Sequence, residues 1–361
     1  MTRFTIAIAA TLASLAGADT PVTFNATSHS GIQFSADSSL VFTSMFNGLD
    51  HDIVATPSTG GFSTLVVGGP GNQVIEDIDA SGDILFLDDS SGFTQVVHYD
   101  GVTATTLTSG PVNHANARFA GSDVVYLKQG IGGVYGIWKH DFVTETAMSV
   151  GPDDCLEPAV SPDGTKVAYV RTDGPLPLPG VLQIWILDLV TGSDSMLTFS
   201  PVNHTNPAWS PDGSMLACVT VPSTPVGAMP TEIWTTTITG LEVPFISDGI
   251  FHGHPRFSPD GTMLSFTSAP GIGNVIDAFD FTSGSVVSLS TDPNLSVTPE
   301  WAPDGSFLAY AAFGGGLPGE IFRVDVAPCV ADWNGDTVVD IFDVLAFIGD
   351  FSAGLSSTDI N

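Results

Sequence analysis

The chain has 361 residues, and 8 Lys and Arg against 39 Asp and Glu give it a formal net charge of −31. Proteins that bind phosphate backbones need clustered basic side chains, so this balance argues against a nucleic-acid partner and against an anionic membrane surface. Hydrophobic residues make up 43% and charged residues 13%. The chain can therefore bury a large core, which argues against general disorder.

Residues 1–18 have the pattern of a secretory signal peptide. Arg3 supplies a positive start, residues 4–15 form an apolar run, and residues 16–18 offer a small-x-small cleavage site. We expect the mature chain to begin at Asp19 and to be exported to the periplasm, the cell surface or the medium; an uncleaved N-terminal anchor is the alternative. No later stretch reaches 18 uninterrupted apolar residues, so no membrane span is expected in the mature chain.

The three cysteines are Cys155, Cys218 and Cys329, and an odd number argues against a closed disulfide framework in an exported protein. Cys218 lies in an apolar strand pattern and is interpreted as a small buried hydrophobe. The sequence does not decide whether Cys155 and Cys329 form a disulfide. Cys329 would lack a possible partner if the second half of a paired C-terminal module were missing.

Four segments end in Pro-Asp-Gly and are followed by an apolar strand: residues 158–164, 207–213, 255–261 and 299–305. Proline fixes φ at the first turn position, and Asp and Gly tolerate the conformations that follow, so each segment predicts a hairpin. Three degenerate copies precede them. The residues equivalent to the Asp of Pro-Asp-Gly, here called the anchors, are 37, 81, 122, 163, 212, 260 and 304.

The anchors are 41 to 49 residues apart, a period typical of propeller blades with four short strands each. Third strands are predicted at 183–188, 232–235 and 320–325, and fourth strands at 195–198 and 285–289. The seventh copy ends after its third strand, whereas a spare strand lies at 21–26. We therefore predict an all-β, seven-bladed propeller over residues 19–327, closed by the N-terminal strand.

The unit Pro-x-(Trp/Phe)-Ser-Pro-Asp-Gly, with Ile-Trp-x-x-Asp downstream, resembles the TolB-type propeller repeat. That family includes periplasmic binding proteins, the propellers of prolyl-oligopeptidase-like hydrolases and some pectin-degrading lyases, so the resemblance implies the fold and leaves the role open. No Gly-x-Ser-x-Gly elbow occurs, and no residues remain for an α/β-hydrolase domain. A serine peptidase of the prolyl-oligopeptidase kind is not expected.

Beyond residue 328 the pattern changes to a small calcium-loop–helix module, predicted over 328–361. Oxygen side chains stand at loop positions 1, 3, 5, 9 and 12, and position 7 supplies a backbone carbonyl, a spacing that suits calcium. The apolar residues of 341–351 predict a short helix that packs against a partner. The calcium ligands predicted from this spacing are Asp332, Asn334, Asp336, Val338, Asp340 and Asp343.

This stretch is similar to a dockerin-type repeat, which implies a second, paired repeat and a protein partner that reads loop positions 10 and 11, here Ile341 and Phe342. Thr337 stands where glycine usually permits the sharp turn. Residues 358–361 resemble the opening of a second loop, so we expect half of a paired module. The alternative is a solvated acidic turn.

Four of the eight histidines share one repeat position, eight residues before the anchor: His29, His114, His204 and His252. His254 follows two residues after the last of them. By the blade order of the resembled family, this position lies near the channel mouth, where imidazoles could bind a transition metal. The favoured alternative is structural: each histidine hydrogen-bonds a neighbouring turn, much as in WD repeats.

Arg118 and Arg256 share the position four residues before the anchor. Near the channel axis they could hold a ligand carboxylate through bidentate contacts. Internal pairing with Asp77 or Glu300 is the favoured interpretation.

Two functional hypotheses follow. The favoured one is an exported, monomeric, non-enzymatic binding module, whose propeller face holds a protein or glycan while the calcium-dependent tail docks to a protein partner. The alternative is a metal-dependent lyase of uronic-acid oligomers, using His204, His252 and His254 with Arg256 on the substrate carboxylate. The first is favoured because no complete catalytic set is visible and the general base is unassigned.

Overall fold

The computed structural model describes residues 19–23, 28–151, 153–172, 180–221, 230–271, 273–290, 295–314 and 317–326. The signal peptide predicted at 1–18 and the calcium-loop module predicted at 328–361 lie outside these residues, so both stay predictions. Across the described ranges, no helix has the length and apolar character that crossing a membrane requires.

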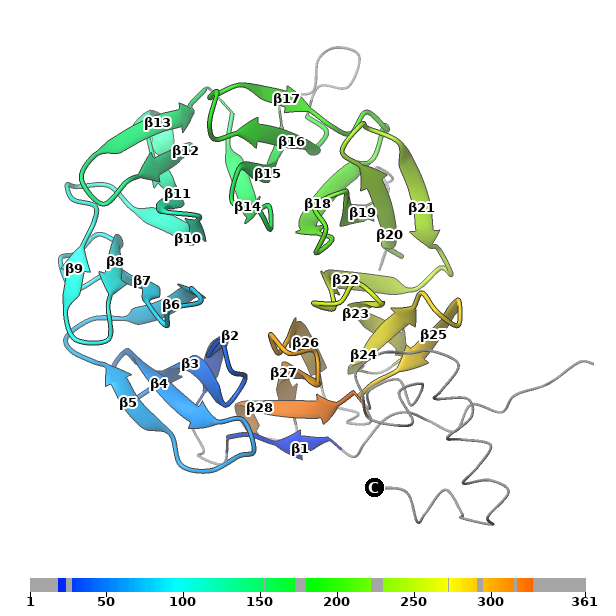
Figure 1. Cartoon of the computed structure of the whole chain (residues 1–361), viewed down its shortest axis with the longest axis horizontal. Helices are drawn as coiled ribbons and strands as arrows, with labels where there is room; N and C mark the ends of the chain where they lie inside the picture. Colours follow the sequence, from blue (N-terminus) through cyan, green and yellow to red (C-terminus); the bar gives the residue numbers. More distant parts are fainter. Residues whose placement is uncertain are drawn as a thin grey trace, which may run out of the picture.

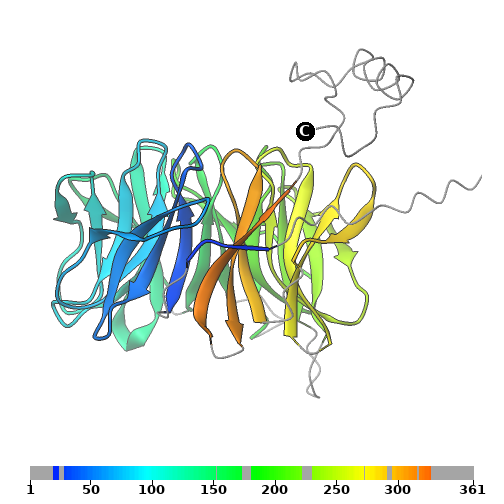
Figure 2. The same ribbon diagram turned by 90° about the horizontal axis from the view of Figure 1, so that it is seen from below.

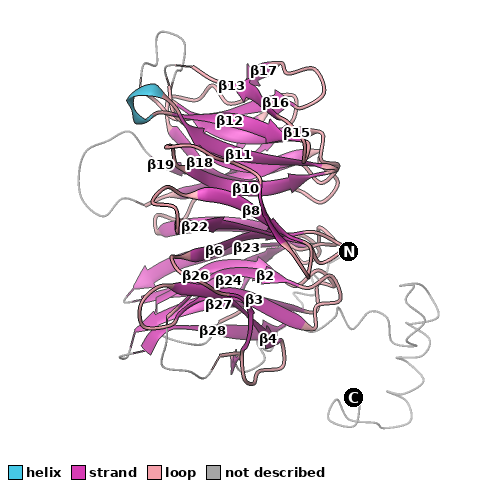
Figure 3. Ribbon diagram, turned by 90° about the vertical axis from the view of Figure 1, so that its left-hand side faces the viewer, coloured by secondary structure: helices cyan, strands magenta, loops and turns pink. Residues whose placement is uncertain are grey.

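Seven four-stranded antiparallel blades surround a central axis (Figure 1). The turns lie on two opposite faces of the ring, with the strands between them (Figures 2 and 3). A parallel pair, Asn274 with Leu295, joins the sixth blade to the seventh. The predicted seven-bladed, all-β propeller is confirmed.

The innermost strands of blades 1 to 7 are β2 (His29–Phe34), β6 (Gln73–Ile78), β10 (His114–Ala120), β14 (Cys155–Val160), β18 (Asn203–Trp209), β22 (Phe251–Phe257) and β26 (Leu295–Trp301). The second strands are β3 (Leu40–Phe46), β7 (Ile84–Asp88), β11 (Asp123–Gln129), β15 (Lys166–Arg171), β19 (Met215–Val221), β23 (Met263–Gly271) and β27 (Phe307–Gly314). They contribute the most deeply buried aromatic side chains, among them Tyr126, Tyr169 and Tyr310.

The third strands are β4 (His51–Pro57), β8 (Gln95–Tyr99), β12 (Tyr135–His140), β16 (Gln183–Asp188), β20 (Glu232–Thr237), β24 (Gly273–Asp280) and β28 (Leu317–Asp325). The outermost strands are β5 (Thr64–Val67), β9 (Ala104–Thr106), β13 (Glu145–Ser149), β17 (Asp194–Met196), β21 (Glu242–Ile246), β25 (Ser285–Ser288) and, in blade 7, β1 (Thr20–Pro21). One 3-10 turn, η1 (Ile131–Gly133), precedes β12. The third and fourth strands predicted from the repeat lie where expected, within a few residues.

The ring closes through β1, which pairs antiparallel with β28 (Figure 1). Thr20 lies opposite Arg323 and Pro21 opposite Phe322, and the Val22 N–H donates to the Ile321 carbonyl at 2.8 Å. The predicted closure by the N-terminal strand is confirmed. Among the described residues the ladder covers residues 20–21, and residues 24–26 of the predicted strand lie outside the described ranges.

The Pro-Asp-Gly step forms the predicted hairpin through its aspartate. Asp163 Oδ1 accepts hydrogen bonds from the Ser161 hydroxyl at 2.6 Å and from the Thr165 N–H at 3.0 Å. These donors lower the pKa of Asp163 to about 2. Gly164 follows at φ +69°, and a Cβ there would lie 2.6 Å from the Gly121 nitrogen of the preceding blade. Glycine is therefore needed for both the turn and the contact between blades.

Cys218 is 1% exposed on β19, and burial raises the pKa of its thiol above the ordinary range. This environment confirms the interpretation of Cys218 as a small buried hydrophobe. Cys329 lies outside the described residues.

Candidate functional site

The innermost strand of every blade carries a β-bulge in its pairing with the second strand. In β18, for example, the pairing register shifts between Thr205 and Ala208. In six of the seven blades the bulged residue has a left-handed backbone: Gly31, Asn116, Glu157, Asn206, His254 and Thr298 have φ between 49° and 65°. Such a backbone is uncommon for residues other than glycine and asparagine, and bulges of this kind redirect side chains beside functional sites.

A cavity of about 550 Å³ opens inside the ring beside these bulges. Its wall includes the repeat position four before the anchor in every blade: Gln33, Asp77, Arg118, Ala159, Ala208, Arg256 and Glu300. It also reaches Ser161 and Pro162, so it extends toward the face that bears the Pro-Asp-Gly turns. Equivalent positions of seven blades thus meet in one concave site, the channel cavity.

Both arginines of the channel cavity are paired with carboxylates. Arg118 Nη1 lies 2.9 Å from Glu76 Oε2 and also donates to the Glu76 carbonyl at 2.8 Å. Arg256 Nε lies 2.9 Å from Glu300 Oε1. The expected internal pairing is therefore present, with Glu76 rather than Asp77 as the direct partner of Arg118.

Burial lowers the pKa of Arg118, but Glu76, Asp77 and, more weakly, Glu300 raise it above its ordinary value. Burial in turn raises the pKa of Glu76 and of Asp77. Arg118 lies in blade 3 and Glu300 in blade 7 across the ring (Figure 1). The charged side chains of blades 2, 3, 6 and 7 therefore interact with one another around the part of the channel cavity away from blades 4 and 5.

The opposite side, over blades 4 and 5, is built differently. Ala159 and Ala208 occupy the position that holds larger side chains in the other five blades, and the neighbouring wall is formed by Glu157, Pro207 and Trp209. Glu157 Oε2 accepts the Asn206 N–H at 2.5 Å. Among the described residues, Glu157 forms no ion pair.

The four histidines of the shared repeat position do not line this cavity. They are 0 to 2% exposed, and burial lowers the pKa of His29 to about 4. His29 Nδ1 lies 2.8 Å from the Thr43 hydroxyl, and His114 Nδ1 lies 2.9 Å from the Thr94 carbonyl. His252 has both ring nitrogens engaged, Nδ1 with Ser268 at 3.1 Å and Nε2 with Asp248 at 2.8 Å.

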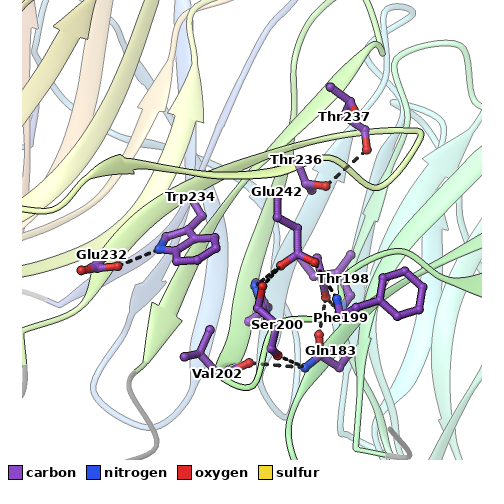
Figure 4. Close-up of polar contacts among 12 residues, drawn as sticks. Gln183, Thr198, Phe199, Ser200, Val202, Glu232, Trp234, Thr236, Thr237 and Glu242 are labelled. Atoms are coloured by element: carbon purple, nitrogen blue, oxygen red, sulfur yellow. Dashed lines mark hydrogen bonds and ion pairs between the residues drawn. The ribbon is translucent and has the colours of Figure 1, made fainter. Parts of the chain in front are cut away.

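His204 lies at the contact of blade 5 with blade 4, where its backbone N–H donates to the Leu182 carbonyl at 2.9 Å; within blade 5 its Nε2 lies 3.2 Å from Glu242 Oε2. Glu242 also accepts the Phe199 N–H at 2.6 Å and the Ser200 hydroxyl (Figure 4). Burial would raise the pKa of Glu242, but the ion-pair contact with His204 and the hydrogen bonds from Ser200 and Phe199 lower it to about 2.

The same contact is extended by a second buried network. Gln183 accepts from the Thr198 hydroxyl at 2.6 Å and donates to the Ser200 carbonyl at 2.9 Å (Figure 4). His204 is therefore buried in the packed interface between blades 4 and 5.

His254 lies at a bulge, half-buried, and its Nδ1 has no hydrogen-bond partner in the described part of the chain. Burial lowers its pKa. No three His, Cys, Asp or Glu side chains of the described residues lie together so that they could hold a metal ion. The structure thus does not bring His204, His252 and His254 together as a ligand set, which favours the structural interpretation of the histidines.

A family model described as the TolB beta propeller domain (PD40) matches residues 136–328, more than half of the chain. A curated "Protein TolB homolog" from Protochlamydia amoebophila (strain UWE25) is 50% identical over 50 residues, a match that covers 14% of this chain and only 9% of that protein.

Solved structures with similar folds have different activities. An oligogalacturonate lyase in complex with manganese has a TM-score of 0.66 at 12% identity, over 82% of this chain and 88% of that one. A puromycin-hydrolyzing peptidase from Mycobacterium tuberculosis has a TM-score of 0.66 at 14% identity, over 83% and 51%. The propeller of the Trilobed protease from Pyrococcus furiosus has a TM-score of 0.63 at 10% identity, over 82% and 95%. At these identities the similarity concerns the fold alone.

Proposed function

The chain belongs to the TolB beta propeller domain family, and from that premise we propose that it is a non-enzymatic binding module whose ligand site is the channel cavity. The fold occurs in both binding proteins and enzymes, so the choice between these functions has to be argued from the residues of the site. The observation that carries the proposal is the ring of bulged inner strands, which places one residue from each blade on the wall of a 550 Å³ cavity.

The lining suits recognition better than bond cleavage. It combines charged pairs, amides and apolar walls, and no histidine is among the described residues that form it. We favour a protein ligand over a glycan because Pro158, Pro207 and Trp209 offer apolar contacts beside the amide of Asn206, a mixture that suits an extended peptide.

The proposal includes the rest of the predicted molecule. The signal peptide would export the chain to the periplasm, the cell surface or the medium, where it would act as a monomer. The calcium loop at 332–343 would order the tail for a protein partner, in the manner of a dockerin repeat.

The proposal is tested with the purified chain on displayed peptides and on a glycan array. In the Ala159→Leu variant the larger side chain occupies the cavity, whereas Ala147→Leu adds the same atoms to an exposed position on β13. We expect ligands to lose at least about tenfold in affinity with Ala159→Leu and nothing with Ala147→Leu. If Ala159→Leu left the ligand affinity unchanged, the channel cavity would not be the binding site. Formation of unsaturated products from oligouronides would contradict the non-enzymatic role.

A further inference from the structure

The carboxylates that line or adjoin the channel cavity differ in whether they already hold a cation. Glu76 is paired with Arg118 and Glu300 with Arg256, each at 2.9 Å. Asp77 accepts the Phe119 N–H at 2.8 Å and lies near Arg118. Among the described residues, Glu157 forms no ion pair, and its carboxylate accepts the Asn206 N–H. One carboxylate oxygen of Glu157 is therefore left for a ligand.

Glu157 stands beside the two smallest residues of the shared wall position. It belongs to blade 4, whose wall position is Ala159, and it reaches the neighbouring blade, whose wall position is Ala208. The arginines and their acids occupy the wall of blades 2, 3, 6 and 7. A ligand side chain can therefore enter over the two alanines without displacing an ion pair.

Trp209 adds an aromatic wall at the same place. Its indole Nε1–H donates to the Ala159 carbonyl at 2.9 Å, which fixes the orientation of the ring. Pro158 and Pro207 extend this apolar surface. A cation beside an acid and an aromatic ring is stabilised both by the ion pair and by the π-system.

We propose that the group bound there is a cation, the ammonium or guanidinium of a Lys or Arg side chain on a protein partner, held by Glu157 over Ala159 and Ala208. This inference rests on the proposed function and specifies the chemistry of its ligand. The net charge of −31 would speed the approach of such a partner.

An anionic ligand fits the same cavity less well. Arg118 and Arg256 are the cations of its wall, and each is already compensated by a carboxylate. A ligand carboxylate would compete with Glu76 or Glu300 and would meet the unpaired charge of Glu157. An acidic peptide or an acidic glycan is therefore the contrary outcome of the test.

The test uses the full chain and two labelled peptides of equal length, one rich in arginine and one rich in glutamate, with binding followed by fluorescence anisotropy at low and physiological salt. Glu157→Gln removes the charge but keeps an acceptor for the Asn206 N–H, so the fold is preserved. Asp277→Asn on β24 is the matched control, because it removes the same charge from a side chain that has no hydrogen bond or ion pair among the described residues.

We expect Glu157→Gln to weaken binding of the arginine peptide about tenfold and Asp277→Asn to leave it unchanged. Equal effects of the two variants would mean general charge attraction and would overturn the inference. Tighter binding of the glutamate peptide, lost in Arg256→Gln, would also overturn it. Failure of the arginine peptide to bind at all would overturn it too, whereas displayed ligands sensitive to Ala159→Leu would still support the binding module.

Discussion

The indole Nε1–H of Trp209 donates to the backbone carbonyl of Ala159 in the preceding blade at 2.9 Å. Trp301 in blade 7 makes the corresponding contact with blade 6, where its indole N–H donates to the Arg256 carbonyl at 3.2 Å. The same N–H also donates to the Ser265 hydroxyl at 2.9 Å. The tryptophan of the repeat motif thus joins neighbouring blades at the channel cavity.

Trp301→Phe should destabilise the propeller more than Trp209→Phe. Trp209 loses one hydrogen bond, about 1 kcal/mol, whereas Trp301 loses two and leaves the buried Ser265 hydroxyl without this donor, about 2 kcal/mol. Urea unfolding measures both. Trp185→Phe is the control, because the Trp185 N–H has no hydrogen-bond partner among the described residues. A loss of stability in Trp185→Phe as large as in Trp301→Phe would mean that ring packing, not hydrogen bonding, is responsible.

The architecture could be predicted because its signals are local and repeated. Pro-Asp-Gly encodes a turn whose hydrogen bonds involve Ser161, Asp163 and Thr165, residues within four positions of one another. Repetition of that turn at a period in the forties leaves few folds other than a propeller. The ring closure followed from counting strands, since one was missing at the end and one was spare at the start.

The site was less predictable because it depends on contacts between blades. The bulge column contains Gly31, Asn116 and Asn206, residue types that tolerate a left-handed backbone, and this signal was available in the sequence. The burial of His252 could not be predicted from the sequence, because its partners Asp248 and Ser268 come together only after the blade has formed. The unpaired state of Glu157 likewise depends on which side chains of other blades reach it.

His252→Ala should act on stability. His252 is 1% exposed and has both ring nitrogens engaged, so the substitution leaves Ser268 and Asp248 without these partners and opens a small void. We expect a loss of about 2–4 kcal/mol in the free energy of unfolding. Denaturant unfolding and metal analysis of the same samples are both needed. A variant of normal stability that had lost a bound transition metal would favour the lyase hypothesis instead.

Acid should weaken the fold before the aspartates of the turns are protonated. Burial lowers the pKa of His29 from 6.5 to about 4 and lowers those of His114 and His254. The unfolded chain therefore binds more protons, and stability falls as pH decreases from about 6.5 to about 4. His29 alone would contribute up to about 3 kcal/mol to this loss. Denaturant midpoints measured against pH should have a smaller slope in His29→Asn, and an unchanged slope would contradict the assignment.

Glu320 at the ring closure should behave in the opposite sense. It is 6% exposed and accepts a hydrogen bond from the Thr23 hydroxyl, and burial raises its pKa. Because its folded pKa is the higher one, the stability it contributes is present at low pH and is lost as pH rises through that pKa. Glu320→Gln should therefore raise the melting temperature by about 2 °C at neutral pH and by nothing in acid. A lower melting temperature at neutral pH would show that the ionised carboxylate is needed at the closure, and Thr23→Val, which removes the donor, serves as the comparison.

The predicted calcium loop should fold only with its ion. Asp332, Asp336, Asp340 and Asp343 bring four carboxylates into one twelve-residue loop, so their mutual repulsion opposes ordering until a divalent cation neutralises it. Binding and ordering of the tail should then occur as one event, because a ligand that binds only the folded loop stabilises it by mass action. The propeller should be indifferent to calcium, since its described residues hold no group of side chains that could bind a metal ion. Titration calorimetry on the full chain measures the heat of calcium binding, and Asp332→Ala combined with Asp343→Ala should abolish it. An absence of heat at millimolar calcium, or a signal that survives both substitutions, would mean that the loop is merely an acidic turn.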